Sequence, residues 1–178
     1  VLGYIEPAKA FTGFAHPAVV TVALVLLISK GLEKSGFILL IGNQIQKFAN
    51  NQMQFMVILT LFAAVLSSFM NNIGAMAMLL PITLGICQKM EWNPSKFLMP
   101  LAFASILGGM NTKIGTPPNI IISEFRNEYT ESTFSFFDFS YVGMPLTLFG
   151  ILFISFLGWR LITLRTINSS ENPLIKIE

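Results

Sequence analysis

The sequence predicts an all-α integral membrane protein, and three observations lead to this fold class. Apolar residues make up 53% of the 178 residues and charged residues only 11%, well below the quarter or so that is typical of soluble domains. Long apolar segments follow one another, several of them near the roughly 20 residues that a helix needs to cross a bilayer. The net charge of +2 is small. The basic residues of the chain lie in short connectors without interleaved aromatics, which argues against nucleic-acid binding.

The first crossing is predicted over the apolar run Ala18 to Ile28. A break at His16-Pro17 precedes this run, and the charged stretch 30–34 follows it. The next apolar stretch, Phe37 to Phe48, carries polar residues at helical spacing and is predicted to form a helix in the membrane interface.

A re-entrant helical hairpin is predicted over Met53 to Ile86. As one helix, this run of roughly 34 residues would extend about 50 Å, against a hydrocarbon core of about 30 Å. Its polar residues cluster between Ser67 and Gly74, so each flank of about 13 residues would reach only about 20 Å. A hairpin with its polar tip inside the membrane fits both lengths.

The lysines predict that both ends of this hairpin face the cytoplasm. Lys47 precedes the hairpin, and Lys89 and Lys96 follow it, while basic residues accumulate on the cytoplasmic side of membrane proteins. The run Phe97 to Ile122 then crosses outward.

The last crossing returns to the cytoplasm. Ser123 to Ser140 carries four acidic residues and one arginine, as expected of an external connector, and Tyr141 to Leu164 is a long apolar span that ends among arginines. Residues 1–167 are therefore predicted to be one transmembrane domain, with 168–178 as a cytoplasmic linker or tail. Because the chain begins at Val1, we expect it to be an internal piece of a longer protein.

The segment Asn111 to Asn119 interrupts the apolar run Phe97 to Ile122. Its two prolines remove two backbone donors and Gly115 permits unusual dihedrals, so the bare carbonyls and amides must line a cavity or bind an ion. Proline is tolerated in a first helical turn, so Pro117-Pro118-Asn119 is predicted to begin the next half-helix. Taken alone, Pro-Pro could also be a simple kink.

The hairpin tip repeats this logic. Its serine and asparagine oxygens suit a hard monovalent cation, and Asn71 or Asn72 can cap the following half-helix. The carbonyls that end the first arm favour a cation, while the amides that begin the second arm favour an anion. Asn-Asn alone could serve as capping or interhelical contact, but two consecutive interrupted segments indicate a transporter binding site.

Catalysis is not predicted. His16 is the one histidine, Cys87 is the one cysteine, and no Asp or Glu lies within an apolar segment. An enzyme would therefore lack a carboxylate pair, a metal cluster or a buried proton relay. We expect no enzymatic activity and no cofactor other than sodium as a coupling ion.

Two sets of motifs resemble the divalent anion/sodium symporter family of the ion transporter superfamily, as a citrate-transporter-like permease. They are Ser67-Ser68-Phe69-Met70-Asn71-Asn72 with Leu79-Leu80-Pro81, and Ile106-Leu107-Gly108-Gly109 with Ile114-Gly115-Thr116-Pro117-Pro118-Asn119. The resemblance implies two inverted repeats, each with a re-entrant hairpin and a discontinuous helix, and an elevator-like motion. This chain resembles the first inverted repeat only.

Motif chemistry and resemblance together predict the site. The residues expected at sodium are Ser67, Asn71, Asn72, Thr112 and Gly115. The residues expected at the substrate are Asn72, Ile73, Gly74, Lys113, Thr116, Pro117 and Asn119. Ile73 stands where the family has threonine, so backbone amides would make that anion contact. Lys113 stands where relatives carry an apolar residue, and a charge inside the membrane predicts a functional role or a side chain that reaches toward water.

The expected function is secondary active transport of a small anion, dicarboxylate or sulfate-like, coupled to sodium. The alternatives are a cation/proton antiporter or oxyanion efflux permease of the same superfamily, or a non-transporting truncated membrane module. Expected partners are the anion, sodium, membrane lipid, a second repeat, a cytoplasmic regulatory domain and a second copy in a homodimer. The expected location is a bacterial inner (plasma) membrane.

Overall fold

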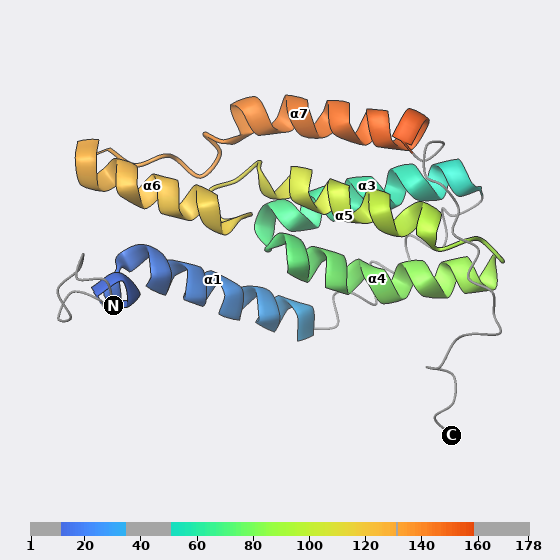
Figure 1. Ribbon diagram of the computed structural model, residues 1–178, viewed down its shortest axis with the longest axis horizontal. Helices are drawn as coiled ribbons and strands as arrows, with labels where there is room; N and C mark the ends of the chain where they lie inside the picture. Colours follow the sequence, from blue (N-terminus) through green and yellow to red (C-terminus); the bar gives the residue numbers. More distant parts are fainter. Residues whose placement is uncertain (1–11, 35–50, 131, 159–178) are drawn as a thin grey trace, which may run out of the picture.

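The computed structural model describes residues 12–34, 51–130 and 132–158, and within these ranges the protein contains helices and no strand (Figure 1). The helices are α1 (Pro17–Lys34), α3 (Gln52–Phe69), α4 (Asn72–Lys89), α5 (Ser95–Gly109), α6 (Pro117–Thr130) and α7 (Ser140–Phe153). A 3₁₀ turn, Thr12–Ala15, precedes α1, and a π-helical turn, Ile154–Gly158, extends α7.

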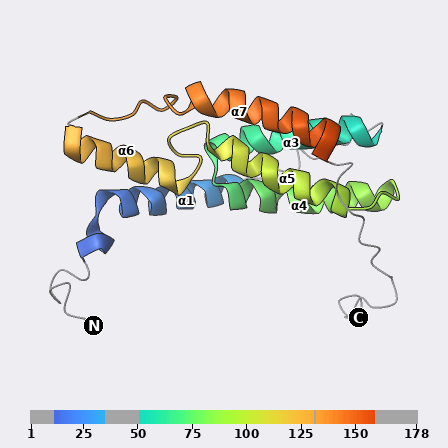
Figure 2. The same cartoon turned by 45° about the horizontal axis from the view of Figure 1, so that its top comes forward.

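The helices occupy two halves of an elongated molecule. Helices α3, α4 and α5 pack together in one half, with α7 against α3 and α5, while α1 and α6 lie side by side in the other half (Figures 1 and 2). The turn between α3 and α4 and the connection between α5 and α6 both lie where the two halves meet. This arrangement brings the two interrupted segments together.

The core lies between α3, α4 and α5. Phe55 and Phe97 are fully buried, and their ring centroids are 4.9 Å apart. Toward the other end of the α3–α5 contact, a Cβ atom on Gly108 of α5 would lie within 3 Å of three backbone atoms of Ala64 of α3. Small residues let helix backbones approach closely in membrane proteins, so α3 and α5 are in near backbone contact at this crossing.

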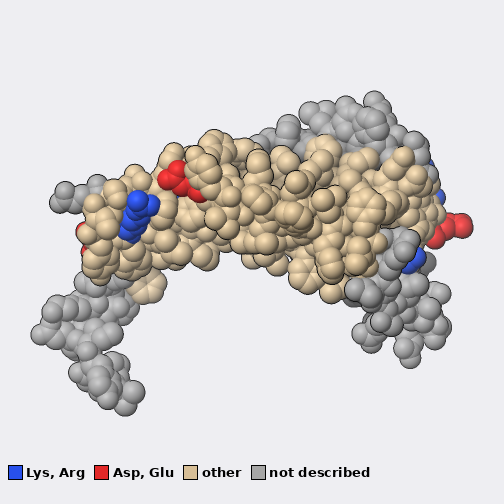
Figure 3. Space-filling view, turned by 90° about the horizontal axis from the view of Figure 1, so that it is seen from above, with Lys and Arg blue, Asp and Glu red and all other residues tan. Residues whose placement is uncertain are grey.

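Charged side chains lie toward the two ends of the long axis on the face drawn in Figure 3, and the surface between them carries none. Among the described residues, two helical segments are long and apolar enough to cross a bilayer, Gln52–Phe69 and Ser140–Gly158. A wide uncharged band is the surface that a hydrocarbon environment requires.

The predicted hairpin is confirmed as two helices joined by a tight turn, but the predicted length of its arms is wrong. Each arm has 18 residues rather than about 13, which corresponds to about 27 Å. The first arm begins one residue earlier, at Gln52, where Asn51 Oδ1 caps it by accepting a hydrogen bond from Gln54 N at 2.8 Å. It also continues through the two serines of the predicted tip to Phe69. The second continues through polar residues to Lys89. The length of the first arm therefore does not show that this arm ends inside the membrane.

The predicted connector Ser123 to Ser140 is also wrong in its first half. Helix α6 continues to Thr130, because the prolines that start it are followed by no other helix breaker and its last six residues are exposed. The second half then returns to the break, where Lys113 N donates to Phe136 O at 3.0 Å. The connector thus contacts the site region instead of only linking two crossings.

The predicted break at His16-Pro17 is confirmed, since α1 begins at Pro17 and ends at Lys34. Proline suits this first position because its missing N–H would have no helical partner. The start of the last crossing is confirmed by α7. The predicted interfacial helix Phe37 to Phe48, the end of the last crossing and the tail 168–178 lie outside the described residues.

Candidate functional site

The site is built where the hairpin tip meets the α5–α6 connection, residues 110–116, which we call the break. Thr112 Oγ1 donates to the carbonyl of Ser68, and Ser67 Oγ donates to the carbonyl of Ser105 at 2.5 Å. Both bonds join the end of α3 to the end of α5 or to the break. The two interrupted segments of the sequence are therefore one structural unit.

The hairpin tip exposes the positive end of a helix dipole. Asn71 caps α4, because its Oδ1 accepts from Gly74 N at 2.6 Å. The N–H groups of Asn72 and Ile73 lie in the first turn, where no intrahelical acceptor exists, and neither donates to another described residue. The Ile73 side chain is 78% exposed. Free amides and a dipole end together favour a negatively charged ligand.

Neutral oxygens converge beside this tip. Ser67 Oγ lies 2.8 Å from Asn72 Oδ1 and 2.5 Å from Ser105 O. One hydroxyl hydrogen satisfies only one of these two acceptors. A Cβ atom on Gly109 would lie within 3 Å of both Asn72 Oδ1 and Gly115 O, so the side-chain oxygen and the loop carbonyl surround the same glycine. Such an oxygen cluster without formal charge is suited to a hard monovalent cation.

The break is held in shape by its own side chains. Gly115 N donates to Thr112 Oγ1 at 3.1 Å, and Asn119 Nδ2 donates to Thr112 O at 2.9 Å. A Cβ atom on Gly115 would lie 2.5 Å from Gly109 O, so the two ends of the loop nearly touch. The break is consequently a closed loop and not an extended linker.

The start of α6 differs from the start of α4. Its first two residues, Pro117 and Pro118, have no N–H to donate, and Asn119 N already donates to Thr116 O at 3.1 Å. The amides available to an anion therefore come from α4. Thr116 and Pro117 are half-buried beside the loop, as is Lys113, the one charged residue of the break.

The predicted residues thus fall into three groups. Ser67, Asn72 and Gly115 contribute oxygens to the cluster. Asn71, Gly74, Thr112 and Asn119 make hydrogen bonds that shape the tip and the break. Ile73 is exposed, and Lys113, Thr116 and Pro117 are half-buried. Within the described ranges, no three His, Cys, Asp or Glu side chains lie close enough together to hold a metal ion.

Three contributors were missed from the sequence. Ser105 contributes through its backbone carbonyl, for which side-chain chemistry gives no signal. Ser140 and Thr147 of α7 bind the break from a distance of roughly 30 to 40 residues along the chain, as Ser140 Oγ donates to Asn111 O and Asn111 Nδ2 donates to Thr147 Oγ1. The adjacent glycines 108 and 109 were the one signal in the sequence that other backbone segments pack closely against the end of α5.

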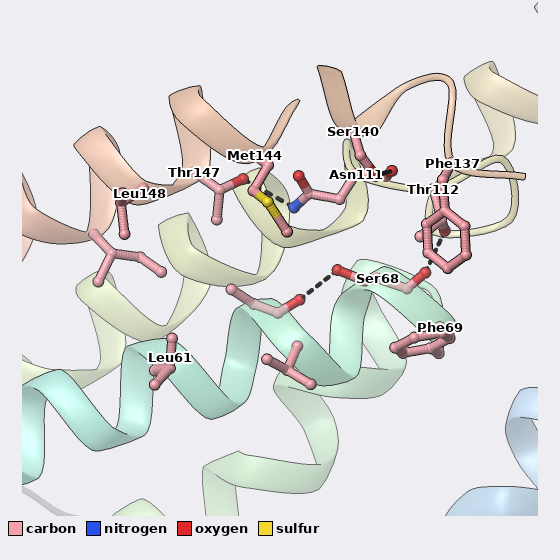
Figure 4. Close-up of a pocket in the computed structure, with 13 residues that line it drawn as sticks. Leu61, Ser68, Phe69, Asn111, Thr112, Phe137, Ser140, Met144, Thr147 and Leu148 are labelled. Carbon is pink, nitrogen blue, oxygen red and sulfur yellow. Dashed lines mark hydrogen bonds between the residues drawn. The ribbon is translucent and has the colours of Figure 1, made fainter. Parts of the chain in front are cut away.

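A cavity of about 420 Å³ lies between α3 and α7 beside the break (Figure 4). It is lined by Leu61, Ala64, Val65, Ser68, Phe69, Asn111, Thr112, Phe137, Ser140, Met144, Thr147, Leu148 and Ile151. Each of its hydroxyl and amide side chains already hydrogen-bonds within the protein. The surface that remains is largely apolar.

Comparison with known proteins places the chain among transporters. A family described as "Citrate transporter" matches residues 1–172. The "Uncharacterized transporter YfbS" of Escherichia coli (strain K12) is 33% identical over 153 residues, which cover 85% of this chain and 25% of the relative. "Sodium/sulfate cotransporter 1" of Chlamydomonas reinhardtii is 28% identical over 155 residues, which cover 83% and 18%. "Probable sodium/sulfate cotransporter 3" of the same organism is 29% identical over 158 residues, which cover 84% and 18%. The chain spans about a quarter or less of the length of these relatives.

Proposed function

Because the chain belongs to the citrate transporter family, we propose that it forms the first of two inverted repeats of a sodium-coupled secondary transporter for a small anion. As a member of this family it is an all-α integral membrane protein. The observation that carries the proposal is the oxygen cluster, in which Asn72 Oδ1 and Gly115 O lie beside Gly109 and Ser67 Oγ lies 2.8 Å from Asn72 Oδ1. A second repeat with its own hairpin and break would complete the site.

Sodium would bind in the oxygen cluster. Half-helix C-termini and unwound carbonyls hold sodium in transporters built from discontinuous helices. The cluster has both, because Ser105 O belongs to the last turns of α5 and Gly115 O to the break. We assign Ser67, Asn72 and Gly115 as ligands, with Asn71 and Thr112 shaping the tip and the break.

The anion would bind at the N-terminus of α4, through the amides of Asn72 and Ile73. Gly74 N is committed to the cap, and the first three residues of α6 offer no free amide, so Thr116, Pro117 and Asn119 would shape the pocket beside the anion. A cation and an anion bound at adjacent sites attract each other, so binding of one raises the affinity for the other. A sulfate-like or dicarboxylate substrate agrees with relatives that are named sodium/sulfate cotransporters.

The wider assignments belong to the same proposal. The two ends of the hairpin would lie on the cytoplasmic side of a bacterial inner membrane, and the acidic end of α6 would lie on the outer side. The substrate-bearing part would move past a scaffold in an elevator-like way, in a homodimer, with a cytoplasmic regulatory domain elsewhere in the complete protein.

Uptake by proteoliposomes that contain the complete protein tests this function. We expect an inward sodium gradient to drive accumulation of radiolabelled sulfate or succinate, and an equal potassium gradient to drive none. Sodium should also raise the melting temperature of the purified protein above its value in potassium at equal ionic strength, because a ligand that binds only the folded state stabilises it. Uptake driven by an inward proton gradient and indifferent to sodium would overturn the proposal in favour of proton coupling.

Lys113→Leu tests the charge in the break. If the ammonium group attracts the anion, KM for the anion should rise about tenfold, which corresponds to roughly 1.4 kcal/mol of lost attraction. Lys113→Arg keeps the charge and should stay close to wild type. The KM of the leucine variant and its dependence on sodium are the measurements. Unchanged values for both would exclude an electrostatic role for Lys113.

A further inference from the structure

Helix α7 is fastened to the break through one asparagine. We propose that Asn111 is a positioning residue that holds the break against α7 and thereby sets the apparent affinity for sodium. This inference rests on the proposed function. Asn111 lies outside the oxygen cluster and acts on it through the loop that carries Gly115.

The contacts of Asn111 reach α5 and α7 at once. Its Nδ2 donates to Thr147 Oγ1 at 2.9 Å (Figure 4) and to Gly108 O at 3.0 Å. Its backbone carbonyl accepts from Ser140 Oγ at 2.6 Å. Thr147 Oγ1 in turn donates to Leu107 O at 2.8 Å. Because the last four carbonyls of a helix lack intrahelical partners, these side chains satisfy the end of α5 where the break begins.

Helix α7 presents one continuous face to the break. Ser140, Gly143 and Thr147 are spaced three and four residues apart, which places them on the same side of a helix. A Cβ atom on Gly143 would lie 2.9 Å from both Asn111 Oδ1 and Met110 O. The glycine therefore lets the α7 backbone meet the break directly, and no alternative side chain fits there without moving the loop.

Asn111 is also too deeply buried to be a surface contact. It is 9% exposed, and its Oδ1 has no hydrogen-bond partner among the described residues. A buried unpaired oxygen costs free energy, so the arrangement persists because the other bonds of this side chain outweigh it. Those bonds fix the rotamer of Asn111 and the path of the backbone that follows.

That backbone leads at once to the site. Thr112, the next residue, donates to Ser68 O on α3 and accepts from Gly115 N. The loop is thus held by α7 on one side and by the hairpin on the other. A metal ligand must lie within about 0.2 Å of its position for full affinity. Release of the α7 contact would let Gly115 O move and would weaken cation binding without touching a ligand.

The sodium concentration that gives half-maximal anion uptake is the readout. In Asn111→Ala we expect this concentration to rise about tenfold or more, as is typical when a group that orients a ligand is removed. Maximal uptake at saturating sodium should fall much less. Thr147→Val removes the same contact from the α7 side and should shift the value in the same direction, whereas Thr147→Ser keeps the hydroxyl and should restore it.

One control variant and one substitute variant make the result interpretable. Thr130→Val makes the same chemical change on the exposed end of α6, where Thr130 Oγ1 bonds to Arg126 O and Ser132 Oγ, and should leave the sodium curve unchanged. If Asn111→Ala does not fold, Thr147→Val carries the test. Wild-type uptake that needs no sodium would overturn the proposed function. Sodium-dependent wild-type uptake with an unchanged half-maximal sodium concentration in the folded variants would overturn the role of Asn111 alone.

Discussion

Gly108→Ala is expected to separate α3 from α5 and to destabilise the protein more than any other alanine substitution considered. The added methyl group would lie within 3 Å of the O, Cα and C atoms of Ala64, which are all backbone atoms and have no rotamer by which to move aside. Overpacking of a well-packed contact typically costs about 1–3 kcal/mol, and here both helices must shift. The bond from Ser68 Oγ to Gly108 O, at 2.9 Å, would be lost as well.

The measurement is thermal unfolding of the purified complete protein in detergent, with the yield of monodisperse protein as a second readout. Gly85→Ala is the matched control, because it makes the same change in α4 where no heavy atom lies within 4 Å of the new methyl group. That variant should be as stable as wild type or gain roughly 0.5–1 kcal/mol, since alanine is a better helix former than glycine. Equal melting temperatures for the two variants would contradict the close crossing.

Asn72→Ala is expected to abolish sodium-dependent uptake in a protein that still folds. The substitution removes the side-chain oxygen that lies beside Ser67 and near Gly115 O. Folding should survive because Ser67 Oγ keeps the carbonyl of Ser105 as an acceptor at 2.5 Å. Loss of an outer-shell partner alone costs about 10- to 100-fold in affinity, so loss of a direct ligand should reduce uptake at least as much.

Initial uptake rates and the sodium-dependent rise in melting temperature measure this effect together. Asn127→Ala makes the same chemical change on the exposed surface of α6 and should retain both. A folded Asn72→Ala protein with normal uptake and a normal response to sodium would remove Asn72 from the site and leave the oxygen cluster without its main side-chain ligand.

Local sequence chemistry was sufficient to predict both interruptions. Ser67 to Gly74 became the hairpin tip, and Asn71 proved to be the cap of α4, one of the two candidates. Pro117 begins α6 as the preference of proline for a first turn predicts. These features depend on residues within a few positions of one another, so a single sequence contains the necessary information.

Pairing over long sequence distances could not be predicted in the same way. The bond between Asn111 and Thr147 joins residues 36 positions apart, and the bond between Ser67 and Ser105 spans 38. Each of these side chains has a plausible local partner, so nothing in the sequence selects the distant one. The continuation of α6 was missed because the charged and polar residues from Ser123 to Thr130 resemble a polar connector when hydrophobicity alone is considered.

The dependence of the break on α7 also has a consequence for synthesis. The break leaves the ribosome before its α7 partners do, and the 36 residues between Asn111 and Thr147 take about 2–7 s to translate. Throughout that interval the carbonyls of Leu107 and Asn111 lack the hydroxyl groups of Thr147 and Ser140 that later bind them. Membrane insertion of this region must therefore either wait for α7 or rely on water and the translocon to shield the break until α7 arrives.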